Sequence, residues 1–415
     1  MAAFDRRGTS PGHERVEPGP KATTVSGGSA QRDIRVLHVS EPNDYGAARV
    51  VYNLARQMKG QGVESVVCTP SGPLAQWLHD IGIDTLELPF SRRSPPSYVR
   101  SIRALRRVVG QGEFTVVHAH SSFSGLLVRL GRTRRFPPVV FQPHAWSFLA
   151  LHGVPRFLAV ALERVLARRT DMFIFVSGEE LQLARDSHIR CSPMAVVPNG
   201  IDFTPDGSRR VAPDPPTNLV IGCVGRLAHQ KGIDVLLRAV SSDHWPSCSS
   251  VEIIGDGRER ATLESLARSL GVADRVTFLG SDDAPRARLK TWDLFVFPSR
   301  YEAGAALALL EAANEGLPIV TTDVAGAKKL LGGDSARIVP VEDHHALASA
   351  VANAVSRWPE TVEAGLRDRA RAMAMFPLEG QMDQMRQVYA SVTGQSRRGA
   401  KPDRARTVRR SRPHP

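Results

Sequence analysis

The chain of 415 residues lacks any apolar run that approaches the length of about eighteen residues needed by a membrane-spanning helix. Its N-terminus, MAAFDRRGTSPGHERVEPGP, also lacks the apolar core of a signal peptide. These absences exclude an integral membrane protein and give no signal for secretion. We therefore expect a cytoplasmic protein, whose only membrane contact would be peripheral, at the inner face.

Cysteine is scarce as well. The four cysteines, Cys68, Cys191, Cys223 and Cys248, stand far apart, with no CxxC pair and no histidine at the spacing of a zinc finger. This pattern excludes a disulfide framework and a structural zinc site, so we expect four reduced thiols.

Aromatic residues make up only 6% of the chain and are not interleaved with its basic residues, as they are in proteins that bind single-stranded nucleic acids. The formal net charge of +12 would otherwise suggest such a partner. However, residues 395–415 alone hold eight Arg or Lys against one Asp, a net +7 that leaves +5 for the rest. A mildly basic body without a recognition motif predicts no nucleic-acid partner.

Between two tails rich in Gly, Pro, Ser and Arg, strand and helix patterns alternate over a long stretch. We expect residues 1–32 and 395–415 to be disordered, because they hold too little apolar surface to offset the entropy of ordering. Runs such as IRVLHVS, SVVCTP, FTVVHAH, PVVFQPH and DMFIFVS each precede a helical pattern. This alternation predicts a parallel sheet covered by helices, which we assign to residues 33–203.

A break follows, because FTPDGSRRVAPDPPTN has four prolines and almost no hydrophobic periodicity. We assign residues 204–217 to a linker. Strand patterns then return in NLVIGCVG, SVEIIGDG, RVTFLG, DLFVFPS, LPIVTTD and ARIVP, within a second domain at residues 218–376. A last helix is expected at residues 377–394. The sequence thus predicts an α/β fold of two doubly wound, Rossmann-like domains facing across a cleft, with ligands at the carboxyl ends of the strands.

Several motifs lie at these strand ends. They are YGAARVVYNLA, VVHAHSS, QPHAWSF, FVSGEE, VVPNGID, VGRLAHQKG, IIGDG and PSRYEAGAALALLEAANEGLPIVTTD. Together and in this order they resemble the retaining glycosyltransferases of family 4, or glycosyl transferases group 1, over roughly residues 34–394. The resemblance implies the GT-B fold, a nucleotide diphosphate sugar as donor, and transfer with retention of anomeric configuration.

VGRLAHQKG places Arg226 and Lys231 five positions apart in a glycine-flanked turn between a strand and a helix. Fixed cations there would stabilise the charge that a leaving nucleoside diphosphate gains as the glycosidic bond breaks. The resemblance implies that both bind the donor diphosphate, and the alternative is two solvated loop residues. A Walker-type loop is excluded because no GxxxxGK[ST] occurs here.

The long last motif predicts the second half of the donor site. Gly304, Ala305 and Ala306 are small and are expected to open a helix whose free N–H groups suit a phosphate, although smallness for packing fits equally. The resemblance implies that Glu311 holds the ribose hydroxyls and that Glu302 acts in catalysis by holding hydroxyls of the transferred sugar. The family separates these two acids by seven residues, whereas eight separate them here, so Glu302 is displaced by one position. An exposed surface glutamate is the alternative for Glu311.

In the first domain, QPHAWSF resembles the strand end whose histidine faces the donor sugar, which implies a catalytic role for His144; a structural histidine is the alternative. Gly46 resembles the second glycine of a loop that approaches the donor phosphates. His118 and His120 stand in HxH spacing, and we favour lining of the acceptor cleft over a metal site, because the sequence supplies no matching carboxylates. We expect no metal and no cofactor besides the donor.

The sequence therefore predicts an enzyme that moves a sugar to a glycan, lipid-linked or small-molecule acceptor in polysaccharide biosynthesis. A retaining glycosidase would need two carboxylates about 5 Å apart, and no convincing nucleophile stands out. The resemblance implies same-face attack instead, with the leaving phosphate receiving the acceptor proton. Two alternatives stay open. One is an inactive sugar-nucleotide-binding protein, suggested by the displaced Glu302 and the altered YGAAR loop, and the other is a sugar-nucleotide epimerase of the same fold.

Residues 97–109, SYVRSIRALRRVV, place Tyr98, Ile102, Leu105 and Val109 on one helical stripe, with four arginines elsewhere. Such a helix, with the basic tail, could adhere weakly to an anionic membrane. We favour a helix that packs this stripe on the first sheet.

Overall fold

The structure is a computed structural model, and it describes residues 34–88, 95–203, 214–282 and 285–394. The predicted tails at residues 1–32 and 395–415 lie outside the described residues, as do residues 204–213 of the predicted linker.

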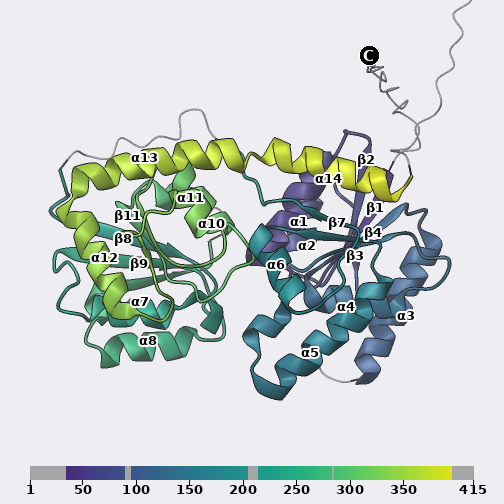
Figure 1. The fold of residues 1–415 in the computed structure, drawn as a ribbon, viewed down its shortest axis with the longest axis horizontal. Coiled ribbons are helices and arrows are strands. Elements are labelled where there is room, and N and C mark those ends of the chain that lie inside the picture. Colours follow the sequence, from purple (N-terminus) through teal and green to yellow (C-terminus); the bar gives the residue numbers. More distant parts are fainter. Residues whose placement is uncertain (1–33, 89–94, 204–213, 283–284, 395–415) are drawn as a thin grey trace, which may run out of the picture. The chain divides into compact units, whose positions relative to one another are not determined.

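The first sheet is parallel, with the strand order β3-β2-β1-β4-β5-β6-β7 (Figure 1). The order reverses at β1, which pairs with both β2 and β4 and makes the sheet doubly wound. The strands are β1 (Ile34–Ser40), β2 (Val63–Thr69), β3 (Thr85–Glu87), β4 (Val116–His120), β5 (Val139–Gln142), β6 (Met172–Phe175) and β7 (Met194–Val196).

Helices cover both faces of this sheet. They are α1 (Tyr45–Met58), α2 (Pro73–Asp80), α3 (Pro95–Gln111), α4 (Ser121–Gly131), α5 (Gly153–Leu166) and α6 (Gly178–Asp186), with the 3-10 turns η1 (Ser147–Ala150) and η2 (Ala167–Arg169). Successive strand residues point to opposite faces, so Val36 joins a core with α1 while Leu37 and Val39 join a core with α3. Burial on both faces explains the nearly continuous apolar runs of these strands.

Helix α3 contains the amphipathic stripe found in the sequence. Leu105 and Val109 are buried and belong to the core between the helices and the first sheet. The ring of Tyr98 lies edge-on to that of Phe123, with centroids 5.6 Å apart. The prediction that this stripe packs inward is confirmed, so the apolar side of α3 is not free to meet a membrane.

The second sheet is also parallel and doubly wound, with the order β10-β9-β8-β11-β12-β13. Its strands are β8 (Leu219–Val224), β9 (Ser249–Ile254), β10 (Val276–Gly280), β11 (Leu294–Phe297), β12 (Ile319–Thr322) and β13 (Ile338–Val339). Its helices are α7 (Ile233–Val240), α8 (Arg260–Ser269), α9 (Arg286–Leu289), α10 (Leu307–Asn314), α11 (Ala327–Leu331), α12 (His344–Ser356) and α13 (Trp358–Met375), with 3-10 turns η3 (His229–Lys231) and η4 (Ala273–Arg275).

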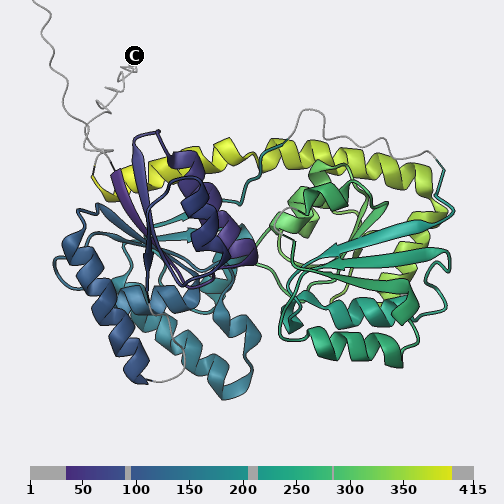
Figure 2. The ribbon, with the colours of Figure 1, turned by 180° about the vertical axis from the view of Figure 1, so that it is seen from behind.

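The last helix, α14 (Leu378–Val392), lies within the predicted range 377–394, and it packs on the first sheet. Its buried side chains Met382, Met385 and Tyr389 share a core with strands β1, β4 and β5 and with α1. Figures 1 and 2 both show α14, in yellow, beside the purple α1. The C-terminal helix therefore completes the hydrophobic core of the N-terminal domain.

The four cysteines form no disulfide, as the sequence predicted, and all except Cys248 are buried. Among the described helices, none combines the length and the apolar character that crossing a bilayer requires.

Candidate active site

The turn after β8 carries the two predicted cations, and one glycine fixes its position. Gly232 ends η3 with φ 62°, in the left-handed region that favours glycine. A Cβ atom at Gly232 would lie only 2.1 Å from the carbonyl oxygen of Pro298, just after β11. Only glycine therefore lets this turn approach the end of the neighbouring strand, where the second donor motif begins.

Arg300 holds the same two segments together. Its guanidinium donates to both carboxylate oxygens of Asp234 at 2.8 Å and to the carbonyl of His229 at 2.7 Å. Its backbone N–H donates to the carbonyl of Gln230 at 2.8 Å. The residues on either side of Lys231 are thus bonded to the segment that carries Glu302. Sequence reasoning did not single out Arg300 or Asp234.

Lys231 and Glu302 form an ion pair, with Lys231 Nζ 2.5 Å from Glu302 Oε1. Both side chains are mostly buried, with exposed fractions of 17% and 10%. The Lys231 ammonium also lies 5.1 Å from the centroid of the Phe297 ring. The acid that is displaced by one position in sequence therefore points at the predicted diphosphate cation and away from solvent.

Arg226, the other predicted cation, is exposed. It lies near the loop before α1, close enough for its charge to act on Asp44. Burial raises the pKa of Asp44, and the positive charge of Arg226 opposes this rise. Gly46 lies in the first turn of α1 and is exposed, and a Cβ atom there would meet nothing within 4 Å. Packing does not explain this glycine, and the approach of the donor phosphates to its backbone stays a prediction.

Helix α10 begins later than predicted. The sequence placed its start at Ala305, whereas the helix starts at Leu307 with Ala306 as its N-cap in extended conformation, so Gly304 and Ala305 belong to the preceding turn. A Cβ atom at Gly304 would lie 3.0 Å from the carbonyl oxygen of Val176, so this residue also has a packing reason to be small. The first N–H groups of α10 still have no partner within the helix, which is the arrangement that suits a phosphate.

A hydrogen bond between two of the sequence motifs holds the turn before α10 in place. The Ser177 hydroxyl, from FVSGEE, donates to the carbonyl of Ala303 at 2.5 Å. The same hydroxyl accepts the N–H of Glu180 at 3.0 Å and caps α6. Residues 303 and 304 therefore touch the end of β6.

Glu311 lies in the second turn of α10 and is half-buried. Burial raises its pKa to about 7, and the charges of Arg49 and Arg286 oppose this rise. Its carboxyl is thus close to α1, which the sequence connected with the donor through Gly46. Arg49 stacks over the Trp77 ring at 4.0 Å, and its part in this site was not predicted.

His144 stands in a strained turn after β5. Its φ is 54° and that of Ala145 is 93°, values that cost side-chain-bearing residues roughly 1–3 kcal/mol each. The buried carboxylate of Glu180 accepts the N–H groups of Ala145 and Val176, both at 2.9 Å. Burial raises the pKa of Glu180 to about 7, an effect that the two N–H bonds oppose. Glu180 therefore holds the turn, although the sequence offered only its presence in FVSGEE as a signal.

A chain of histidines runs inward from His144. Its Nε2 lies 3.0 Å from Nδ1 of His120, whose Nε2 lies 3.0 Å from Nδ1 of His38. Burial lowers the pKa of His144 to about 4 and that of His38 to about 3. Neutral imidazole has one donor and one acceptor nitrogen, so the three rings can bond head to tail. No hydrogen bond joins His144 to Lys231 or Glu302, although the structure describes all three.

His118 and His120 do not line an open surface, contrary to the prediction of an acceptor-cleft wall. Both are fully buried at the end of β4, and Nδ1 of His118 lies 2.8 Å from the hydroxyl of Tyr389 in α14. The prediction missed this because α14 was not expected to cover the first sheet. Ring nitrogens of His38, His118 and His120 lie within 4.8 Å of one another, a spacing that a metal ion could bridge.

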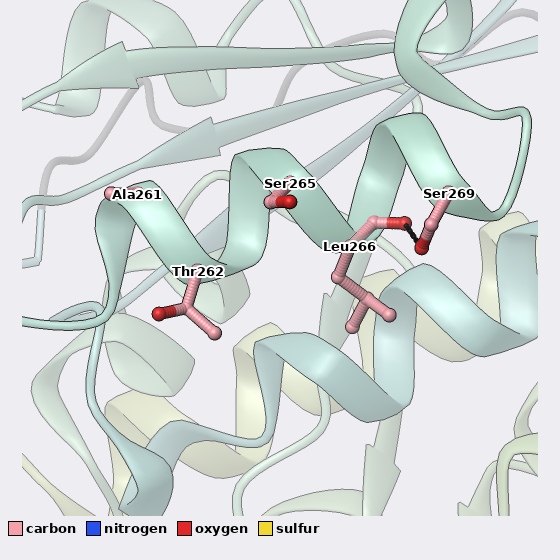
Figure 3. Close-up of a pocket in the computed structure, with 5 residues that line it drawn as sticks. All are labelled: Ala261, Thr262, Ser265, Leu266 and Ser269. Carbon is pink, nitrogen blue, oxygen red and sulfur yellow. Dashed lines mark hydrogen bonds between the residues drawn. The ribbon is translucent and has the colours of Figure 1, made fainter.

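A surface pocket lies elsewhere, on the second domain. Its lining residues are Ala261, Thr262, Ser265, Leu266 and Ser269, all on helix α8 (Figure 3). None of the predicted site residues lines it, so the pocket adds nothing to the assignment of the site.

Two family models match this chain, one for each domain. The model described as Glycosyltransferase Family 4 matches residues 45–204, and the model described as Glycosyl transferases group 1 matches residues 218–357. The chain is 29% identical over 309 residues to the putative glycosyltransferase EpsF of Bacillus subtilis, covering 70% of this chain and 79% of that protein. It is 28% identical over 280 residues to the UDP-Gal:alpha-D-GlcNAc-diphosphoundecaprenol alpha-1,3-galactosyltransferase of Escherichia coli, covering 63% and 72%.

Solved structures agree on the fold. Sucrose-phosphate synthase from Thermosynechococcus elongatus superposes with a TM-score of 0.73 at 20% identity, over 87% of this chain and all of that one. HepE of Anabaena, solved with UDP-glucose, superposes with a TM-score of 0.72 at 18% identity, over 86% and 100%. With both domain models matched in order on two doubly wound sheets, the chain belongs to the glycosyltransferases of family 4, the group 1 glycosyl transferases of GT-B fold.

Proposed function

We propose that this glycosyltransferase moves a sugar from a nucleotide diphosphate sugar to its acceptor with retention of anomeric configuration. The observation that carries the proposal is the contact between Lys231 and Glu302 at the carboxyl ends of β8 and β11. It places a cation suited to a diphosphate beside a carboxylate suited to sugar hydroxyls. In the free protein these two groups neutralise each other, and the donor would supply each with a new partner.

The proposed reaction breaks the bond between the anomeric carbon and the phosphate oxygen and forms a bond to the acceptor oxygen on the same face of the sugar. The acceptor proton passes to the leaving phosphate. Arg226, Lys231 and the first N–H groups of α10 would stabilise the charge that grows on the leaving group. Glu311 would accept hydroxyl donors of the ribose.

His144 is proposed to contact the transferred sugar as a neutral ring, because burial holds its pKa near 4. With Nε2 engaged by His120, its Nδ1 is the atom left for the sugar. A neutral imidazole suits hydrogen bonding to a hydroxyl and leaves the acceptor proton to the phosphate.

A lipid-linked acceptor fits the relatives best. The Escherichia coli relative is named for a diphosphoundecaprenol acceptor. A human relative, one of the subunits of phosphatidylinositol N-acetylglucosaminyltransferase, is 27% identical over 353 residues, covering 79% of this chain and 70% of that protein. We propose an acceptor of this lipid-linked class, and a transfer that needs no metal.

The test is a screen of the purified full chain against nucleotide diphosphate sugars, with release of nucleoside diphosphate as the readout and with chelator in parallel. Lys231→Ala serves as the inactive control, and the anomeric configuration of the product is read by NMR. Transfer with retention and without added metal supports the proposal. Binding without turnover would indicate an inactive binder, isomerised donor would indicate an epimerase, and an inverted product would contradict the mechanism.

A further inference from the structure

Helix α5 turns a row of large apolar side chains outward. Their exposed fractions run from 43% to 70%. They are Val154, Phe157, Leu158, Leu162 and Val165. The 3.6-residue helical repeat gathers these positions on one side of the helix. Five such side chains on one helix form a contiguous apolar surface of the kind that marks an interaction site.

The opposite side of α5 is fixed to the first domain by charge. Glu163 is buried and accepts from Arg129 of α4 through both carboxylate oxygens, at 2.7 and 3.0 Å. The Arg129 guanidinium in turn lies 3.9 Å from the centroid of the Phe141 ring of β5. A buried ion pair therefore anchors the inner face, and the outer apolar face is not needed for packing within the chain.

The exposed charges along α5 and η2 are all positive. Arg156, Arg164 and Arg168 are exposed, whereas the one acid of this stretch, Glu163, is buried in its ion pair. Arg156 lies seven residues before Glu163 and therefore on the inner side of the helix, whereas Arg164 and Arg168 lie beside the apolar row. Arg164 and Arg168 form no ion pair with a described residue. Apolar side chains flanked by arginines, with no exposed acid, complement a surface of acyl chains beneath anionic headgroups.

The position of α5 connects this surface with the site. The helix starts at Gly153, in the connection that follows β5, so its first turn lies at the same edge of the sheet as His144. In both views of the fold α5 forms the lower border of the helices around the first sheet (Figures 1 and 2).

We propose that the outer face of α5 docks this protein on an anionic bilayer, with Phe157 and Leu158 inserted among the lipids and the flanking arginines at the headgroups. This surface replaces α3, whose apolar stripe is used inside the fold. The inference deepens the proposed function, since a docked α5 brings the edge of the sheet that carries His144 to a lipid-linked acceptor.

The test is co-sedimentation of the full chain with vesicles of phosphatidylcholine alone or mixed with phosphatidylglycerol, at low and high salt. Binding is expected only to the anionic vesicles and is expected to weaken with salt. Phe157→Ser combined with Leu158→Ser should lower the partition coefficient about tenfold or more, and so should Arg164→Gln combined with Arg168→Gln. Vesicle binding is measured without donor or turnover. A failure of this inference can therefore be distinguished from a failure of the proposed reaction.

The matched control is Leu366→Ser combined with Met373→Ser on α13, where these side chains are 44% and 39% exposed. The control should bind vesicles as the unmodified chain does. Circular dichroism melting checks that every variant folds. Absence of vesicle binding, or equal loss in the control, overturns the proposal. A change from dimer to monomer in the apolar variant, seen by sedimentation velocity without vesicle binding, would assign the face to a second copy of the chain and also overturns it.

Discussion

At the scale of single residues, the contact between Lys231 and Glu302 shows where the altered motif places its first acid. Eight residues separate the two acids of the last motif where the family has seven, yet Glu302 lies 2.5 Å from Lys231. The short contact requires the segment after β11 to lie against η3, and the bonds of Arg300 to Asp234, His229 and Gln230 keep it there. The extra residue is therefore absorbed before the helix.

Replacement of the two partners should give different phenotypes. Lys231→Ala and Arg226→Ala should lower turnover about 100-fold and weaken binding of nucleoside diphosphate, because each removes a charge facing the leaving group. Glu302→Gln should lower turnover without weakening that binding, because its proposed contacts go to the sugar and its loss frees Lys231 from the ion pair. Titration calorimetry and initial rates measure both. Lys329→Ala, an exposed lysine of α11, is the control, and a fully active Glu302→Gln enzyme would remove this acid from the site.

Glu311 should make nucleotide binding depend on pH. Its pKa in the folded protein is raised to about 7, so the carboxylate forms as pH rises through 7, and the ionised form is the better acceptor for ribose hydroxyls. Affinity for the nucleoside diphosphate product should therefore increase between pH 6 and pH 8, by about tenfold at most. The phosphate of the nucleotide also titrates, and it does so equally for the unmodified chain and for any variant. The control is therefore Glu311→Gln, in which the part of the pH dependence that comes from Glu311 should disappear. An unchanged pH profile in this variant would contradict the assignment.

At the scale of elements, the turn after β5 is the part of the site under strain. His144 and Ala145 both have positive φ, and Glu180 from α6 secures them through the Ala145 N–H. A side chain in α6 thus bonds the backbone next to His144, the proposed contact of the transferred sugar, in the turn after β5. We therefore expect Glu180 to act as a positioning residue.

Glu180→Gln should keep the fold but reduce kcat. The amide retains only one acceptor oxygen, so one of the N–H groups of Ala145 and Val176 loses its partner. We expect kcat to fall about tenfold or more while KM for the donor changes little, because the diphosphate contacts lie in the other domain. The control is Glu179→Gln, the exposed neighbour in α6. Equal kcat in the two variants would assign Glu180 to stability alone.

The sequence predicted the elements well and their partners less well. The bounds of β1 and α14 agree with the residues read from hydrophobic pattern, because strands buried on both faces and an amphipathic helix leave a local signal. The burial of His118 and His120 left no such signal, because it depends on residues far away in sequence. The hydroxyl next to His118 belongs to Tyr389 of α14, which is 271 residues away. The start of α10 was missed because Ala305 and Ala306 have high helix propensity, and the contacts of the turn outweigh it.

At the scale of the whole molecule, the hydrogen bond between Tyr389 and His118 links the two ends of the fold. Both groups are fully buried, and the other ring nitrogen of His118 has no partner within the described residues. The bond is therefore the one polar contact of that ring.

Loss of this hydroxyl should cost stability. Tyr389→Phe leaves Nδ1 of His118 without its partner, which should lower the free energy of unfolding by about 1–3 kcal/mol. Denaturant unfolding at neutral pH measures the change. Tyr52→Phe is the control, since that half-buried ring contacts Arg49 and Trp77 through its face and edge. An effect no larger than that of the control would show that the bond contributes little.

The placement of α14 also affects how the first domain folds during translation. A ribosome delivers β1 through β7 first, and α1 covers part of one apolar face of their sheet. The part that α14 covers stays exposed until residues 378–392 have been synthesised. The first domain therefore cannot finish folding while the second is emerging, even though it is complete in sequence. The nascent chain carries an open hydrophobic surface for as long as the second domain takes to be translated, and chaperones that bind such surfaces have this interval in which to act.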